Sequence, residues 1–169
     1  MSSANPAAAQ SSSQGAVSSE QTFLPLTGHC FCRHLSYTIS SQPLMQGLCY
    51  CRDCQRISGS GFLPWMSVPA SSLTLVGTPK VEHVRGTSAR GTEKVMSACA
   101  DCGSTVFGGR YGVDDQHTVY AGTLDDGCVG RFEPTIALFV SERPAWAKLQ
   151  IEMKEFDRMP GMKPVTSRH

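Results

Sequence analysis

Short stretches in which apolar and polar residues alternate dominate the middle of the chain. Leu35, Tyr37 and Ile39 alternate with polar neighbours and are followed by turn residues at 40–43. A period of two places successive side chains on opposite faces of the backbone, as in a half-buried β-strand. Other predicted strands lie at 62–68, 73–75, 81–84, 105–107 and 136–140, with one more around Val119.

Only two segments, 52–58 and 145–156, have a composition that favours a helix. In the second of these, Trp146 is expected to close the core of the domain. No motif recurs at the period of about 20–50 residues that is typical of repeat proteins. The chain is therefore predicted to have a β-rich fold with short helices.

The ends of the chain differ in composition from its middle. Residues 1–22 are almost entirely Ser, Ala, Gln, Gly and Pro, which bury too little apolar surface to offset the entropy of ordering. This segment is predicted to be a disordered low-complexity tail, and 158–169 a flexible C-terminal tail. A chain of 169 residues with 40% hydrophobic residues then leaves one domain, 23–157, with a core of its own.

Charge and hydropathy exclude several classes of partner. The net charge is +1, from 15 basic and 14 acidic side chains, so no strong field would attract nucleic acid or an anionic membrane. The sequence has no apolar run long enough for a spanning helix, no secretory signal, and no arginine before Arg33. We therefore expect an intracellular protein of the cytoplasm.

Eight cysteines are the strongest chemical feature, and their spacing is uneven. Seven fall into three groups, which are Cys30 with Cys32, then Cys49, Cys51 and Cys54, then Cys99 with Cys102. In a reducing compartment clustered cysteines bind metal or react more often than they form disulfides. Two alternatives remain open, namely disulfides and a single four-cysteine zinc beside three ordinary thiols. Cys128 has no neighbour at ligand spacing and is expected to be a free thiol.

Tetrahedral zinc with four thiolates forms a closed structural site, whereas three protein ligands leave a position for water or substrate. The C-x-C and C-x-x-C pairs can each supply half of a tetrahedron, and Gly103 suits the turn after the second pair. Cys30, Cys32, Cys99 and Cys102 are therefore predicted to hold a structural zinc. Cys49, Cys51 and Cys54 are predicted to hold an open, catalytic zinc, so that each chain binds two Zn²⁺.

The longer motifs around these cysteines are GHCFC at 28–32 followed by Tyr37, CYCRDCQRISGSGF at 49–62, CADCGS at 99–104, AGTLDD at 121–126 and RPAW at 143–146. In content and order they resemble the family of glutathione-dependent formaldehyde-activating enzymes, which includes the centromere protein V type. The resemblance implies an Mss4-like fold of packed, curled antiparallel sheets with both zinc sites. It also implies a carbon–sulfur lyase similar to S-(hydroxymethyl)glutathione synthase, acting on the glutathione adduct of a small carbonyl compound.

Four residues depart from the usual pattern of the family: Arg33 replaces glycine, Tyr50 histidine, Ala98 an aromatic residue and Ala137 histidine. Two alternative functions are therefore kept. One is a zinc Lewis-acid enzyme acting on an organic, natural-product-like substrate without glutathione. The other is a non-catalytic, Mss4-like protein-binding module. An open zinc in a concave pocket would favour an enzyme, and a flat exposed surface would favour a binding module.

Residues near the cysteines have less specific patterns. Asp125 and His29 are expected to have structural roles, and Trp65 to belong to the core with Phe62. Arg52 and Asp53 could either support the thiolates by hydrogen bonding or lie on a solvated turn. The loop 56–61 could either present backbone amides to a ligand or form a simple turn.

Overall fold

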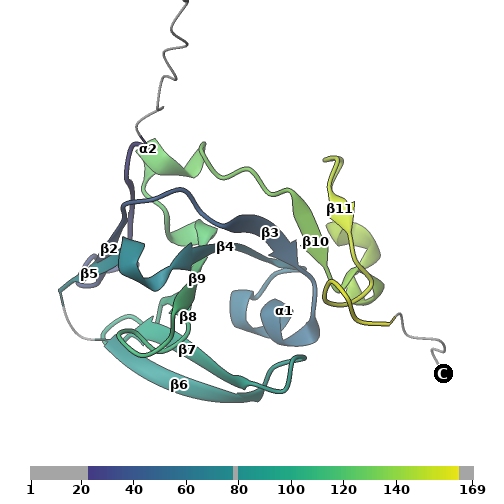
Figure 1. The fold of residues 1–169 in the computed structure, drawn as a ribbon, viewed down its shortest axis with the longest axis horizontal. Helices are drawn as coiled ribbons and strands as arrows, with labels where there is room; N and C mark the ends of the chain where they lie inside the picture. The colour runs from purple at the N-terminus through teal and green to yellow at the C-terminus, as the bar shows by residue number, and fades with distance from the viewer. Residues whose placement is uncertain (1–22, 78–79, 164–169) are drawn as a thin grey trace, which may run out of the picture.

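The computed structural model describes residues 23–77 and 80–163, and these form two β-sheets with few short helices (Figure 1). The mainly β class predicted from the alternating pattern is confirmed. The predicted tail at 1–22, and residues 164–169 of the predicted C-terminal tail, lie outside the described residues. No helix in the described part of the chain has the length and apolar composition needed to cross a bilayer.

The strands follow most of the predicted segments closely, and several further elements appear that the pattern did not indicate. The strands are β1 (Leu26–His29), β2 (Ser36–Ile39), β3 (Met45–Cys49), β4 (Leu63–Pro69), β5 (Leu73–Val76), β6 (Lys80–Thr87), β7 (Glu93–Cys99), β8 (Thr105–Gly108), β9 (Gln116–Tyr120), β10 (Ile136–Leu138) and β11 (Lys154–Glu155). The α-helices are α1 (Arg52–Ser58) and α2 (Asp126–Val129), and the 3₁₀ helices are η1 (Ala70–Ser72), η2 (Ala121–Thr123), η3 (Val140–Glu142) and η4 (Ala145–Ala147). Of these, β1, β3, β7, β11, α2, η1 and η2 were not predicted.

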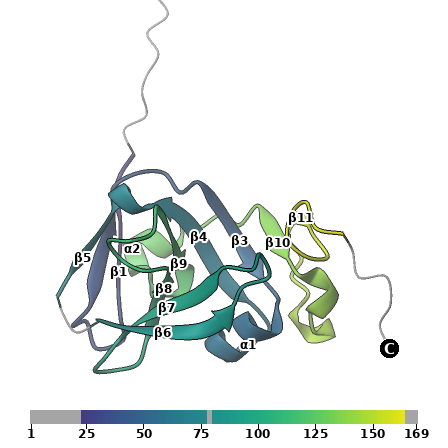
Figure 2. The same ribbon diagram turned by 60° about the horizontal axis from the view of Figure 1, so that its bottom comes forward.

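The smaller sheet has the order β1-β2-β5, and the larger has the order β11-β10-β3-β4-β9-β8-β7-β6. Most neighbours are antiparallel, as expected, but β10 runs parallel to both β3 and β11. A parallel pair needs a long connection, and nearly ninety residues separate β3 from β10. Figure 2 shows the small sheet and β11 at opposite ends of the molecule, with the rest of the large sheet between them.

The predicted helix at 145–156 is wrong. Only η4 forms there, and the chain then becomes β11 on the edge of β10, where the Phe156 N–H donates to the Ala137 carbonyl oxygen at 2.9 Å. A free sheet edge offers backbone partners that outweigh local helix propensity. Trp146 is 74% exposed, so it does not close the core as expected. Its ring instead covers Gly61, where an added Cβ would lie 2.8 Å from the indole.

Helix α1 forms where it was predicted because both of its ends are capped. The Cys51 sulfur accepts a hydrogen bond from the Cys54 N–H at 3.4 Å, as an N-cap side chain does. At the other end Gly59 adopts the left-handed conformation with φ +62°, which glycine allows without strain. The helix buries Cys54 and Gln55, so one predicted metal ligand lies on its inner face.

Candidate metal centres and the adjoining cavity

The structure brings together the four cysteines predicted to form the closed site, although they come from two hairpins far apart in the sequence. Their sulfur atoms all lie within 4.8 Å of one another. The sulfur of Cys32 is 3.5 Å from that of Cys30 and 3.7 Å from that of Cys99. A disulfide requires about 2.05 Å, whereas four sulfurs around zinc at about 2.3 Å are separated by about 3.8 Å. The group therefore fits a tetrahedral metal ion, and all eight cysteines are free thiols.

Two tight turns aim these four sulfurs at one point. After β1, the Arg33 N–H donates to the Cys30 carbonyl oxygen at 3.0 Å, and Arg33 adopts φ +67°. This left-handed conformation favours glycine, which explains why glycine is the usual residue at the position that Arg33 occupies here. After β7, the Gly103 N–H donates to the Cys99 carbonyl oxygen at 2.9 Å, with φ +72°. Each turn thus closes on the carbonyl oxygen of its first cysteine and contains one left-handed residue.

Hydrogen bonds also join the two turns directly. The Phe31 N–H donates to the Ser104 hydroxyl at 3.0 Å, and His34 Nδ1 lies 2.6 Å from Asp101 Oδ2. The Ser104 hydroxyl also lies 3.3 Å from the Cys102 sulfur, and this contact is the main reason that the pKa of Cys102 is lowered to about 5. Because one turn belongs to the small sheet and the other to the large sheet, the four-cysteine group links the two sheets.

The second predicted group, Cys49, Cys51 and Cys54, is also brought together, again with all sulfurs within 4.8 Å of one another. Cys49 ends β3, Cys51 caps α1 and Cys54 lies on the first turn of that helix. The hydrogen bond between Cys49 and Cys51 raises the pKa of the first to about 12 and lowers that of the second to about 2. The pKa of Cys54 is raised chiefly by its hydrogen bond to Cys49. Three thiols this close together share protons, and a bound metal cation would replace those protons.

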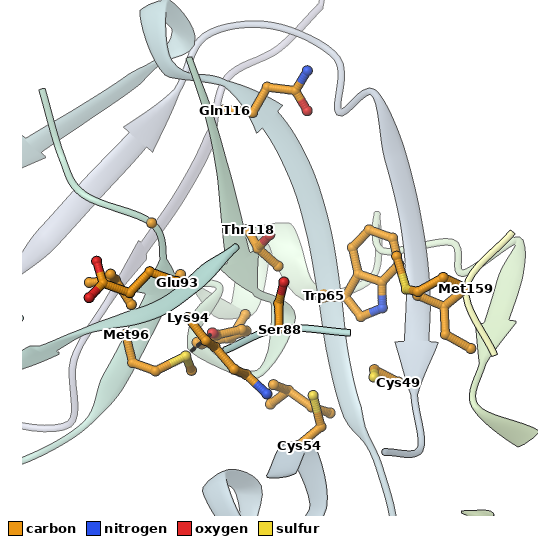
Figure 3. A pocket seen from close by; sticks show the side chains of 16 residues that line it. Cys49, Cys54, Trp65, Ser88, Glu93, Lys94, Met96, Gln116, Thr118 and Met159 are labelled. Carbon is orange, nitrogen blue, oxygen red and sulfur yellow. Dashed lines mark hydrogen bonds between the residues drawn. The ribbon is translucent and has the colours of Figure 1, made fainter. Parts of the chain in front are cut away.

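Lys94 places a positive charge beside this group and was not singled out in the sequence. Figure 3 shows its amine directed toward Cys54. Burial alone would lower its pKa, but Cys54, Cys51 and Asp53 raise it above the ordinary value. Asp53 Oδ2 lies 3.4 Å from the Lys94 amine. Asp53 therefore acts on the three thiols indirectly, by holding Lys94. Arg52 makes its hydrogen bonds to Gln55 and Glu142 and not to the thiols.

A cavity of about 320 Å³ opens directly above Cys49 and Cys54 (Figure 3). Strand register explains its lining, because alternate residues face the same side of a sheet. Leu138 pairs with Cys49, which pairs with Leu63, and Trp65 follows two residues later on β4. The same face continues through further paired residues, which are Tyr120, Thr118, Gly108, Met96 and Lys94. The cavity is thus one face of the large sheet, and it is mostly apolar near the thiols.

Comparisons with known proteins identify the family of the chain. The family model for the glutathione-dependent formaldehyde-activating enzyme matches residues 25–142, which include all eight cysteines. The chain belongs to this family. A search of curated proteins found no match. Among solved structures, a crystal structure of a Rhodobacter sphaeroides protein is similar at 17% identity and a TM-score of 0.45, covering 59% of this chain and 88% of that one.

Two residues that depart from the pattern of the glutathione-dependent formaldehyde-activating family lie away from the cavity. Tyr50 and Ala137 are fully buried on the other side of β3 and β10, in a cluster with Leu48 and Ala147. The Tyr50 hydroxyl donates to the Ala147 carbonyl oxygen at 3.5 Å, and its ring packs against Phe62. These substitutions therefore change core packing and do not line the candidate site.

Asp125, His29 and Cys128 form a separate polar contact that joins β1 to α2. Asp125 Oδ2 accepts a hydrogen bond from the Thr27 hydroxyl at 2.6 Å, and Asp125 Oδ1 lies 3.3 Å from His29 Nε2. The buried Cys128 sulfur accepts a hydrogen bond from the Thr27 N–H at 3.3 Å. These contacts agree with the structural roles expected for Asp125 and His29.

The loop 56–61 is a compact turn. Ser58 Oγ lies 2.9 Å from the carbonyl oxygens of both Cys54 and Phe62, which closes the loop on itself. Among the two interpretations left open by the sequence, this contact favours the turn. Trp65 and Phe62 both belong to apolar clusters, as expected, but Trp65 also lines the cavity.

Proposed function

We propose that this protein is a zinc-dependent carbon–sulfur lyase that forms and cleaves the adduct between a thiol and a small carbonyl compound. The observation that carries the proposal is the position of Cys49, Cys51 and Cys54 on the floor of a concave cavity. A protein-binding module would be better served by a flat apolar surface. The four-cysteine group is proposed to hold the second, structural zinc.

The chemistry of the donor set supports this reaction. Cys49, Cys51 and Cys54 would hold the zinc ion, which would lower the pKa of an incoming thiol. Three thiolates and Zn²⁺ carry a net charge of −1, which disfavours plain hydroxide chemistry. The half-buried Lys94 offsets that charge, and Asp53 holds Lys94 in place.

The reaction conserves atoms and charge without a further reactant. The thiol sulfur forms a bond to the carbonyl carbon, the π electron pair of the carbonyl group moves to its oxygen, and this oxygen takes the proton that the thiol gave up. Cleavage is the reverse. The apolar lining beside Cys49 offers water few hydrogen-bond partners, which favours addition of sulfur over addition of water.

Glutathione is the thiol that we propose. A second cavity, of about 340 Å³, shares Cys49 and Cys54 with the first, and its charged lining consists of three cationic residues, Arg52, Arg90 and Lys94, and two acidic ones, Asp53 and Glu142. Cationic side chains of this kind suit the two carboxylates of glutathione. An intracellular location, as proposed from the sequence, would provide glutathione and keep the thiols reduced.

The test combines metal content with the rate of adduct exchange. Zinc per chain would be measured by mass spectrometry, and exchange between formaldehyde, glutathione and their adduct by NMR. The wild type is expected to hold two zinc ions and to accelerate exchange. Cys54→Ser is expected to lose one zinc ion and the acceleration. Cys128→Ser is the matched control, because that thiol lies outside both groups and a hydroxyl can still accept from Thr27. Full activity of Cys54→Ser with two zinc ions retained would refute the assignment.

A further inference from the structure

The cavity above Cys49 and Cys54 is much better suited to an apolar group than to formaldehyde. Apart from the Lys94 amine beside Cys54, its walls near the thiols are mostly apolar or aromatic side chains, which are Leu63, Trp65, Met96, Leu138 and Met159. Polar groups such as Gln116 and Glu93 lie farther out (Figure 3). A volume of about 320 Å³ falls in the range of pockets that enclose small organic molecules.

Two glycines on the same sheet face let the large aromatic side chains of the cavity lie close to the backbone. A Cβ on Gly47 would lie 3.0 Å from Trp65 Cζ2, so glycine at this position lets the indole ring lie close to β3. A Cβ on Gly108 would lie 3.0 Å from the Tyr120 hydroxyl. Since a catalyst for formaldehyde alone would need no such volume, these residues indicate a larger substrate.

One hydrogen-bond donor at the thiol end of the cavity is unused. Trp65 is 8% exposed, and its indole Nε1 has no hydrogen-bond partner among the described residues. In Figure 3 the nitrogen edge of the ring is turned toward Cys49. The Tyr120 hydroxyl is not available in the same way, because it donates to the Met96 sulfur at 3.1 Å. A buried N–H without an acceptor is costly, and a ligand oxygen would relieve that cost.

We propose that the carbonyl component is an aldehyde or ketone with an aromatic or branched apolar group, which occupies this cavity while its oxygen accepts the Nε1–H of Trp65. The inference rests on the proposed function for the identity of the reacting group. The size and polarity of the ligand follow from the cavity itself. Trp65 is then a specificity-determining residue, since it fixes the carbonyl oxygen at the end nearest Cys49.

Binding of unreactive amides tests the inference separately from turnover. Benzamide has a ring and a carbonyl acceptor, whereas formamide has the acceptor alone. Calorimetry on the zinc-loaded protein is expected to show benzamide binding at least about ten-fold more tightly than formamide, because only the ring fills the apolar cavity. Thr118→Leu narrows the cavity and should weaken benzamide by a similar factor. The control Thr74→Leu, on the exposed side of β5, should change nothing.

Trp65→Phe keeps an aromatic ring but removes the donor. It should weaken benzamide by about two- to twelve-fold, the range of one neutral hydrogen bond, with both zinc ions retained. Trp146→Phe, at the exposed second tryptophan, is the matched control. Equal affinity for both amides, or no effect of Thr118→Leu, would overturn the substrate class. Loss of zinc from Trp65→Phe would overturn the role of its N–H, because the donor would then serve Cys49. Selective benzamide binding without any adduct exchange would instead refute only the proposed function.

Discussion

Replacing Gln55 by leucine should loosen α1, which is capped by Cys51 and bears Cys54, two members of the three-cysteine group. Gln55 is 7% exposed, and its amide donates to the Tyr50 carbonyl oxygen at 2.6 Å and to the Glu142 carbonyl oxygen at 3.0 Å. Leucine has a similar size but no donor, so both carbonyls lose a partner. An unsatisfied buried carbonyl costs about 1–3 kcal/mol, and the part-buried one at Glu142 costs less, so Gln55→Leu should lower the free energy of unfolding by about 2–4 kcal/mol.

Urea unfolding at a fixed concentration of free zinc measures this change, since bound metal also contributes to stability. Arg56→Leu on the same helix is the control, because its side chain is 69% exposed and its ion pair with Asp53 is worth about 0.5 kcal/mol or less. A chelator should also extract zinc from the three-cysteine group faster in Gln55→Leu than in the wild type. If the two variants unfold within 0.5 kcal/mol of each other, a limit of about the expected error, the amide does not anchor α1.

Three further predictions concern the backbone and the thiols. Gly47→Ala should lower the free energy of unfolding by about 1–3 kcal/mol, as seen in thermal unfolding, because its Cβ would lie 2.7 Å from the Ile136 carbonyl oxygen; an unchanged melting temperature would contradict the close packing. Arg33→Gly should stabilise the fold by about 0.5–1 kcal/mol in the same assay, because it relieves a left-handed arginine, and a loss of stability would contradict this. The pKa values of Cys49 and Cys54 are raised, so both hold protons at neutral pH that zinc must displace. Apparent zinc affinity of the open group should therefore fall by about a hundred-fold for each pH unit of acidification, measured by chelator competition; a flat profile would show that these thiols are already ionised.

The ligand groups could be predicted from the sequence because their geometry is local. A C-x-C or C-x-x-C turn brings two sulfurs together whatever the rest of the fold does, and α1 is capped by its own residues, Cys51 and Gly59. Strands β3 and β7 were missed for a physical reason. Their C-terminal halves are buried on both faces, with burial continuous over the last three residues of β3 and the last five of β7. Such strands show no alternation of apolar and polar residues.

The cavity could not be predicted, because it depends on strand register. Lys94, Trp65 and Thr118 come from three strands, and only pairing places them on one face. A one-residue shift in any pair would turn the side chains of that strand to the other side. Trp65 looked like a core residue in the sequence, and it is one, but only the structure shows that its N–H is left without a partner at the thiol end.

The two cysteine groups lie in different apolar clusters, and this predicts different consequences of losing a ligand. Cys30 and Cys99 are buried in the cluster between the sheets, whereas Cys49 and Cys54 belong to the cluster beneath the cavity. Cys102→Ser should therefore separate the two linking turns and lower the free energy of unfolding by about 4 kcal/mol or more, as loss of a structural metal does.

Cys51→Ser should be much milder. Its three-cysteine group is local to one loop and joins no two sheets, and serine is itself a preferred N-cap, so α1 keeps its first turn. We expect Cys51→Ser to lose one zinc ion and the adduct exchange. Its melting temperature should be close to that of the wild type from which a chelator has removed the zinc of the three-cysteine group. Equal destabilisation by Cys51→Ser and Cys102→Ser would mean that both groups hold the fold together. Unequal destabilisation is what an open site requires, because a metal that exchanges ligands during turnover cannot also be the link between the sheets.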